Sequence, residues 1–307
     1  MTEKAPHISV LLTEAVDSLN IQNNGVYVDG TFGAGGYTRK ILDSNPTAHV
    51  IAIDQDETAI AAGQKLVKQY APRLTLLHGK FGDMDKLIDQ PVDGVVLDIG
   101  VSSMQIDNPD RGFSFQKDGP LDMRMGQTGP TAADIVNTFS EKELADIIFK
   151  YGDEKMSRRI AKKIVSARCE KKFETTMELA NAIHMVMPHK AGDIDSATRT
   201  FQALRIFVND ELGQLEQGLN AAVRILKDKG ILSVVSFHSL EDRIVKNFIN
   251  EKSGNTPNSS RYLPEIKKQP SVLKIINKKP ITPTQEEIQN NPRARSSKLR
   301  IAMRVIS

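Results

Sequence analysis

The chain has 307 residues, of which 39 % are apolar and 26 % charged, with a net charge of +3 and a single cysteine, Cys169. This length can hold one large or two ordinary domains with a real hydrophobic core. Lone Cys169 excludes an intrachain disulfide and a cysteine-based zinc site, and we expect no metal site. No apolar run approaches the roughly 18 residues of a membrane span, and residues 1–6 lack the apolar core of a signal peptide, so we expect a cytoplasmic protein without membrane contact.

Short apolar runs alternate with helical periodicity through the first hundred residues, which is the pattern of parallel βαβ units. The strands predicted from these runs are residues 26–32, 50–54, 74–78 and 92–99. The sequence therefore predicts an α/β fold built on a mostly parallel sheet.

A glycine cluster, Asp29-Gly30-Thr31-Phe32-Gly33-Ala34-Gly35-Gly36, ends the first predicted strand. Glycines at a strand-to-helix turn let backbone N–H groups approach a ligand closely. The dinucleotide fingerprint G-x-G-x-x-G would begin at Gly33 and Gly35 but meets Thr38 in place of its third glycine. An acid before such a turn, with another acid one βα unit later, instead resembles the S-adenosylmethionine loop of Rossmann-like methyltransferases.

Asp54 is that second acid, at the end of the second predicted strand and 19 residues after Gly35. A carboxylate there can accept hydrogen bonds from both hydroxyls of a ribose. The alternative is a plain tight turn, with Asp54 as the N-cap of a helix that starts near Glu57. We favour the cofactor interpretation, because two independent features occur where a cofactor needs them.

The character of the chain changes after Gly100. A segment rich in Gly, Pro and Asp precedes helical patterns over residues 132–151, 155–168 and 177–187. We therefore predict a helical insertion at residues 107–209, between a first sheet part (1–106) and a second (210–307). The second part is predicted to contain a helix at 210–226, a strand at 231–237, a helix at 240–250, a loop at 253–269 and an antiparallel pair at 273–277 and 299–306.

Positive charge is concentrated in two segments. Residues 252–307 carry 12 Lys or Arg against three Glu, a balance of +9 that leaves about −6 on the rest of the chain. Residues 155–172 carry eight positive side chains against Glu170, and five of them recur on one helical face: Lys155, Arg158, Arg159, Lys162 and Lys163. A solvated helix face and a phosphate-binding face both account for this pattern.

Polar residues fall at the predicted carboxyl ends of five strands, where doubly wound sheets bind ligands. They are Asp29, Asp54, residues 79–81, Asp98 and residues 237–238. Phe81 could flank an adenine or belong to the core. Asp98 ends a buried apolar run, which favours a functional carboxylate.

Eight segments occur in the order typical of one protein family: HISVLLTE (7–14), DGTFGAGG (29–36), LDIGVSS (97–103), RGFSF (111–115), GPLDMRM (119–125), TRTFQALR (198–205), SFHSLEDR (236–243) and NPRARSS (291–297). They resemble the signature blocks of the RsmH (MraW) family. These bacterial methyltransferases act on a cytosine exocyclic amine of small-subunit ribosomal RNA.

This resemblance implies a class I methyltransferase sheet of about seven strands, S-adenosylmethionine as cofactor and a helical insertion that helps to recognise RNA. The implied substrate is the N4 amine of a cytidine near the decoding centre, in 16S ribosomal RNA within the small subunit. The family's cofactor contacts carry over to Gly35, Gly36, Tyr37, Asp54, Phe81, Asp98 and Gln105, and the glycine loop adds Gly33. Tyr37 replaces a histidine of many relatives, so a backbone contact there would survive more readily than a side-chain contact.

A cytosine amine is a poor nucleophile, because its lone pair is delocalised into the ring, so an acceptor that holds the amine should help transfer. Asp98 is the first candidate, followed by His238 and Ser102. His238 could equally be structural, and Ser102 could cap a turn. Many amino-methyltransferases have Asn/Asp/Ser-Pro-Pro-aromatic where this chain has Asp98-Ile99-Gly100-Val101, so Asp98 could serve the cofactor instead.

Substrate binding would require an unstacked base and neutralised phosphates. The aromatic candidates are Phe113, Phe115 and Phe237, each of which could be core, and the basic candidates are Arg158, Arg159, Lys162, Arg199, Arg205, Arg293 and Arg295. Two other functions stay open: methylation of DNA or of a protein amide, and a non-enzymatic RNA-binding or assembly factor. A homodimer is also compatible with the sequence.

Overall fold

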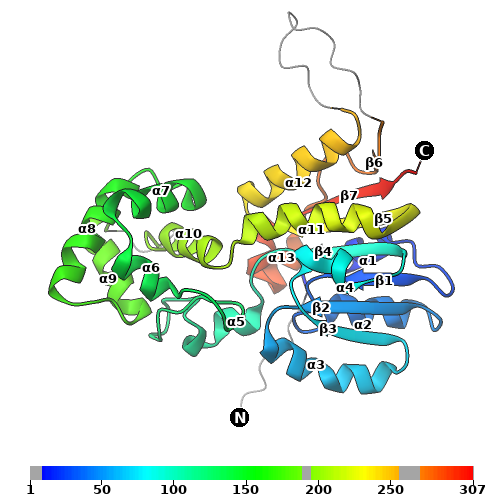
Figure 1. Cartoon of the computed structure of the whole chain (residues 1–307), viewed down its shortest axis with the longest axis horizontal. Coiled ribbons are helices and arrows are strands. Elements are labelled where there is room, and N and C mark those ends of the chain that lie inside the picture. The colour runs from blue at the N-terminus through cyan, green and yellow to red at the C-terminus, as the bar shows by residue number, and fades with distance from the viewer. Residues whose placement is uncertain (1–8, 189–194, 256–269, 307) are drawn as a thin grey trace, which may run out of the picture. The chain divides into compact units, whose positions relative to one another are not determined.

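The computed structural model describes residues 9–188, 195–255 and 270–306. It consists of two compact units (Figure 1). The sheet unit comprises residues 1–100 and 212–307, and the helical unit comprises residues 101–211. The loop predicted at 253–269 lies largely outside the described residues.

A seven-stranded sheet in the order β3-β2-β1-β4-β5-β7-β6 forms the sheet unit. Its strands are β1 (Val26–Asp29), β2 (His49–Asp54), β3 (Leu74–His78), β4 (Val92–Asp98), β5 (Leu226–Ser236), β6 (Leu273–Ile275) and β7 (Lys298–Arg304). Neighbouring strands from β3 to β5 pair in parallel, and β7 is antiparallel to both β5 and β6. The mostly parallel α/β sheet predicted from the sequence is confirmed.

The largest differences from the predicted limits are in β1 and β5. β1 ends at Asp29 instead of residue 32, because pairing with β2 and β4 ends there and the chain enters the loop that contains Gly33, at a φ of +52°. β5 begins five residues early, at Leu226, and is irregular around Lys229-Gly230. The pairing with β4 shifts register there, and Lys229 has a φ of +64°.

Helices pack on this sheet through a shared apolar core, in which Val95 and Leu97 of β4 join Leu215 and Leu219 of α11. The helices are α1 (Leu12–Ser18), α2 (Gly36–Ser44), α3 (Glu57–Tyr70), α4 (Met84–Leu87), α11 (Glu211–Ile225), α12 (Ser239–Lys252) and α13 (Gln285–Asn290), with 3-10 turns η1 (Phe81–Asp83) and η3 (Pro292–Ser296). No helix in the described segments is both long and apolar enough to cross a membrane.

The helical unit has its own core, which includes Leu144, Ile148, Ile160 and Phe201. Its helices are α5 (Ser103–Asp107), α6 (Ala132–Thr138), α7 (Glu141–Gly152), α8 (Ser157–Glu170), α9 (Thr176–Val186) and α10 (Thr198–Val208), with the 3-10 turn η2 (Pro109–Arg111). The single helix predicted at 132–151 is two helices, because Ser140 starts a new one by forming a capping box with Glu143.

Candidate methyl-transfer site at the carboxyl edge of the sheet

Asp29, the last residue of β1, is a buried carboxylate that fixes the glycine loop. It accepts hydrogen bonds from Thr38 Oγ1 (2.6 Å), Thr38 N (3.1 Å) and Thr31 N (3.2 Å). Burial raises the pKa of Asp29 from 3.8 to about 6, against the opposing effect of these hydrogen bonds. The side chain therefore ties the end of β1 to the first turn of α2.

The loop between β1 and α2 depends on its glycines. Gly33 and Gly35 have φ values of +52° and +76°, which L side chains rarely adopt. A Cβ on Gly35 would lie 2.8 Å from the Phe32 ring and 2.9 Å from Leu66. α2 begins at Gly36 without a cap from the Gly35 side, and Thr38 N already donates to Asp29 Oδ2, so the N–H groups of Gly36 and Tyr37 are the ones available to a ligand or to water.

Asp54 completes this loop from β2. Its Oδ2 accepts from Gly33 N at 2.7 Å and its Oδ1 from Asp56 N at 2.8 Å. The backbone N–H of Gln55 is a third donor, so of the roughly four acceptor positions of the carboxylate about one is left for a ligand hydroxyl. Burial raises the pKa of Asp54. The N-cap of α3 is Asp56, which accepts from Thr58 N at 2.9 Å, so the helix-capping alternative for Asp54 is wrong.

Tyr37 and Phe81 are partly committed to packing. The Tyr37 side chain is buried, and its hydroxyl donates to Val10 O, so only its backbone faces the loop region. The Phe81 ring is half-buried against α11, where a Cβ on Gly218 would come within 2.4 Å of it. The ring thus has a packed side, and its partial exposure leaves area for a ligand.

Asp98, the last residue of β4, carries an unfilled acceptor. Its backbone N–H donates to Thr31 Oγ1 at 2.7 Å, but its Oδ1 is buried and has no hydrogen-bond partner among the described residues. Burial first, and then the charges of Asp29 and Glu241, raise the pKa of Asp98 well above its usual value. Because an unpaired buried acceptor is costly, this oxygen is a natural place for a ligand donor.

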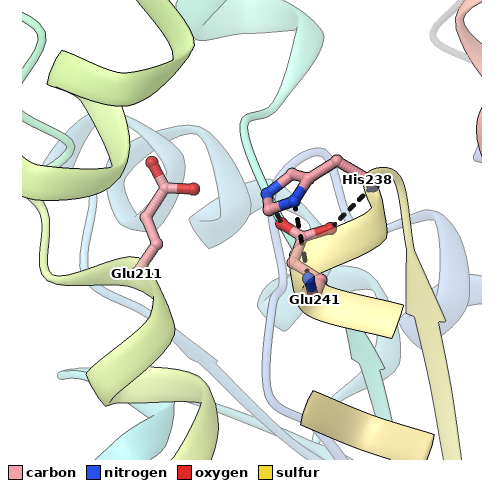
Figure 2. Close-up of side chains that lie close together, drawn as sticks. All are labelled: Glu211, His238 and Glu241. Carbon is pink, nitrogen blue, oxygen red and sulfur yellow. Dashed lines mark hydrogen bonds and ion pairs between the residues drawn. The ribbon is translucent and has the colours of Figure 1, made fainter. Parts of the chain in front are cut away.

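His238 and Glu241 lie at the end of β5 and share the start of α12 (Figure 2). His238 Nδ1 accepts from Glu241 N at 3.4 Å as the N-cap of the helix, and Glu241 Oε2 accepts from Phe237 N at 2.8 Å and His238 N at 3.2 Å. An Nδ1 that accepts places the proton of a neutral imidazole on Nε2. The contacts of His238 thus favour the structural interpretation.

Two residues predicted for the site belong to the helical unit. Ser102 and Gln105 form the capping box of α5: Ser102 Oγ accepts from Gln105 N at 3.3 Å, and Gln105 Oε1 accepts from Ser102 N at 3.1 Å. These contacts explain both polar side chains without a substrate, and a catalytic role for Ser102 stays a prediction.

The aromatic candidates for base stacking differ in their surroundings. Phe115 packs edge-on against Phe201, with ring centroids 4.8 Å apart, within the core of the helical unit. Phe113 is half-buried beside the Arg111 guanidinium, 5.8 Å from the ring centroid. Phe237 is half-buried at the end of β5 and lies 3.7 Å from where a Cβ on Gly100 would be.

The basic candidates differ in exposure and in their contacts. Arg205 makes a bidentate ion pair with the buried Glu211, at 2.8 Å for both Nε and Nη2, and Arg199, whose side chain is 56 % exposed, lies 3.8 Å from the buried Glu154. The remaining candidates are exposed, on α8 and η3: Arg158, Arg159, Lys162, Arg293 and Arg295. Their exposure makes these side chains accessible to the phosphates of a nucleic acid.

Glu241 was not predicted from the sequence, although it belongs to the SFHSLEDR segment. Its position three residues after a possible N-cap is a capping-box signal, which indicates a helix start and says nothing about chemistry. Its burial depends on how α12 packs on the sheet, and sequence periodicity alone does not report this.

Comparisons with known proteins agree with the signature segments. The MraW methylase family model matches residues 4–305. A "Ribosomal RNA small subunit methyltransferase H" of Paramagnetospirillum magneticum is 55 % identical over 97 % of this chain and 96 % of its own length. Proteins of the same name from Bradyrhizobium diazoefficiens and Parvibaculum lavamentivorans are 55 % and 54 % identical, over 98 % of this chain and 92 % and 90 % of their own lengths. The chain therefore belongs to the MraW methylase family.

Proposed function

We propose that this protein transfers a methyl group from S-adenosylmethionine to the N4 amine of a cytidine in 16S ribosomal RNA, near the decoding centre. The observation that carries the proposal is the unfilled Asp98 Oδ1 at the same sheet edge as the glycine loop, in a chain of the MraW methylase family. Relatives named as ribosomal RNA small subunit methyltransferases support the choice of RNA.

The residues of this edge fit the proposed cofactor. The N–H groups that start α2, at Gly36 and Tyr37, suit its carboxylate, and the remaining acceptor position of Asp54 suits a ribose hydroxyl. Gly33 and Gly35 allow the close approach, and Phe81 offers a ring edge for the adenine. When bound, S-adenosylmethionine supplies an electrophilic methyl group whose bonding electrons stay on sulfur.

The chain's own contribution is to hold the amine. Asp98 Oδ1 accepts an N–H of the cytosine amine, orients it and draws electron density toward its nitrogen. Because only the ionised carboxylate is free of a proton, the raised pKa of Asp98 makes this role depend on pH.

Substrate binding is assigned to half-buried aromatic groups and exposed basic groups. Phe113 and Phe237 are the candidates to stack on an unstacked base, while Phe115 is engaged in the core. Exposed charges of α8 and η3 would neutralise phosphates of the RNA backbone. Recognition by shape and charge suits a structured RNA inside the small subunit.

The proposal is tested by transfer of labelled methyl groups to four acceptors in parallel: small ribosomal subunits, naked ribosomal RNA, DNA and protein. We expect transfer to ribosomal RNA or subunits alone. Transfer to DNA or to protein would show that ribosomal RNA is not the substrate. Cofactor titration separates the remaining alternative: cofactor binding without transfer to any acceptor would favour an assembly factor, and absence of binding would contradict an enzyme.

A further inference from the structure

Glu241 is a buried carboxylate with half of its acceptor capacity unused. The residue is 0 % exposed. Its Oε2 accepts two backbone N–H groups, from Phe237 and His238, and this arrangement accounts for its role at the start of α12. Its Oε1 makes no hydrogen bond in the described part of the chain: His238 Nε2, which carries the ring proton of the neutral imidazole, lies 2.8 Å from it as a close contact outside hydrogen-bond geometry. A capping acid needs one oxygen, so the cap does not explain the second.

The unfilled oxygens of Glu241 and Asp98 belong to neighbouring strand ends. β4 pairs with β5 through Asp98 and Val235, and Ile99 N donates to Val235 O at 2.9 Å. The negative charge of Glu241 is one of the causes of the raised pKa of Asp98, so the two carboxyl groups interact. Within the sheet unit, two buried carboxyl groups therefore each leave an oxygen without a donor at the same edge.

Gly100 keeps space open beside Glu241. It has a φ of +115°, and a Cβ at this position would lie 4.0 Å from Glu241 Oε1 and 3.7 Å from the Phe237 ring. The chain thus passes Glu241 as bare backbone, next to an aromatic ring that is half-buried. A flat group that carries N–H donors matches two acceptors and a ring.

We propose that Glu241 Oε1 is the second acceptor for the target amine and takes its proton during transfer. A cytosine amine has two N–H bonds, so Asp98 holds one and Glu241 holds the other. The proton of the second bond passes to the Glu241 carboxylate as the methyl group arrives, and the electrons of that bond stay on nitrogen. This assignment rests on the proposed function, because it presupposes an exocyclic amine as the substrate.

Two acceptors orient the amine more completely than a single acceptor does. A single acceptor fixes one N–H direction and leaves the amine conjugated with the ring, whereas two fixed acceptors restrict its rotation and can hold both hydrogens away from the ring plane. The lone pair is then available to the methyl group. His238 is a positioning residue here: its Nδ1 is bound to Glu241 N, and its Nε2 lies beside Oε1.

The test replaces Glu241 with glutamine. In Glu241→Gln the amide oxygen can still accept from Phe237 and His238, but an NH2 group replaces the free acceptor with a donor that repels an amine. The matched control is Glu143→Gln, which changes the same residue of another capping box, that of α7 in the helical unit. Both variants are compared with the wild-type protein in thermal unfolding, S-adenosylmethionine titration and single-turnover transfer to small subunits.

We expect Glu241→Gln to bind S-adenosylmethionine as the wild type does and to lose about 10²-fold or more in the rate of transfer. The Glu143→Gln rate should not change. Wild-type transfer by Glu241→Gln would overturn the proposal, as would a loss of cofactor affinity that accounts for the whole loss of rate, since that would assign Glu241 to the amino group of the cofactor. If the Gln variant does not fold, Glu241→Asp is used instead. Its side chain keeps the charge but is one methylene shorter, so its oxygen lies farther from the amine and transfer must still slow.

Failure of this inference is distinct from failure of the proposed function. A wild-type protein that methylates no acceptor contradicts the function, whereas an active wild type with an equally active Glu241→Gln variant contradicts the role of Glu241 alone.

Discussion

The backbone N–H of Gly33 donates to Oδ2 of Asp54 at 2.7 Å. This bond joins two features that the sequence presents separately, a glycine cluster after β1 and an acid at the end of β2. The acid sets the shape of the loop and keeps one acceptor position for a ligand. The proposed ribose-binding acid and the glycine loop are therefore one structural unit, and a change in either should disturb both.

Gly35→Ala should lower stability and cofactor affinity together. The φ of +76° costs about 1–3 kcal/mol for a residue with a side chain, and the new Cβ would also press on Phe32 and Leu66. Gly129→Ala is the matched control, because Gly129 has a φ of +91° but a Cβ there meets nothing within 4 Å. Urea unfolding should show a larger loss for Gly35→Ala. Equal losses in the two variants would show that the packing of the loop does not matter.

Asp98→Asn should reduce methyl transfer by about 10²-fold or more, because the substitution removes the charge that draws on the amine. Asp93→Asn on the same strand is the control: Asp93 pairs with Lys227 at 2.9 Å and has no place in the site. Single-turnover transfer measures both, with cofactor affinity determined in parallel. Full activity of the Asp98→Asn protein would show that Asp98 has no catalytic role.

Asp29 should make the protein less stable as pH rises from about 4 to 6. Its folded pKa of about 6 exceeds the value of 3.8 for an exposed group, so the folded state binds the proton more tightly. The stabilising contribution is complete below pH 4 and is lost as pH rises through 6, a change on the order of 3 kcal/mol. In urea unfolding at several pH values, the stability of the wild type relative to Asp29→Asn should fall across this window. A difference that rises with pH would contradict the shift.

His238→Ala should lower the free energy of unfolding by about 1 kcal/mol, because the N-cap acceptor of α12 is lost. His238→Asn should recover most of this loss, since asparagine is a good N-cap. Thermal or urea unfolding compares the two proteins. Equal stability of the alanine and asparagine variants would contradict the capping role. Transfer by the asparagine variant, whose cap is intact, then reports on the imidazole alone.

Replacing Lys155, Arg158, Arg159, Lys162 and Lys163 with glutamine should weaken RNA binding and flatten its dependence on salt. Each phosphate contact that is lost lowers the slope of log K against log salt by about 1. Lys65→Gln/Lys68→Gln on α3 is a control for general loss of charge. If the slope of the five-residue variant stays at the wild-type value, these side chains form a solvated helix face and do not bind RNA.

The sheet was predictable because strand signals are local. Buried apolar runs marked β2, β3 and β4, and the strand-end acids Asp54 and Asp98 could be placed at one edge from parallel topology alone. β1 was predicted too long, because Phe32 continues the apolar pattern past the last paired residue, Asp29, into the glycine loop. Where pairing with strands distant in the sequence ends leaves no local signal.

Some helices and buried acids were also not predicted, because tertiary packing and not local sequence determines them. α10 escaped prediction because its Thr, Phe and Val residues favour helix weakly, and burial of Phe201 and Leu204 in the helical unit compensates for this. The partner of Arg205 is Glu211, six residues away and beyond the usual helical spacing of charge pairs. Glu241 has the pattern of a surface acid, and only the packing of α12 buries it.

The most direct test of the central claim is the identity of the nucleoside that the protein modifies. Small ribosomal subunits are incubated with the protein and S-adenosylmethionine, and their RNA is digested to nucleosides for mass analysis. We expect N4-methylcytidine, formed by the wild type and lost with Asp98→Asn. A methyl group on a ribose, on a ring carbon or on another base would contradict a site built to hold a cytosine amine.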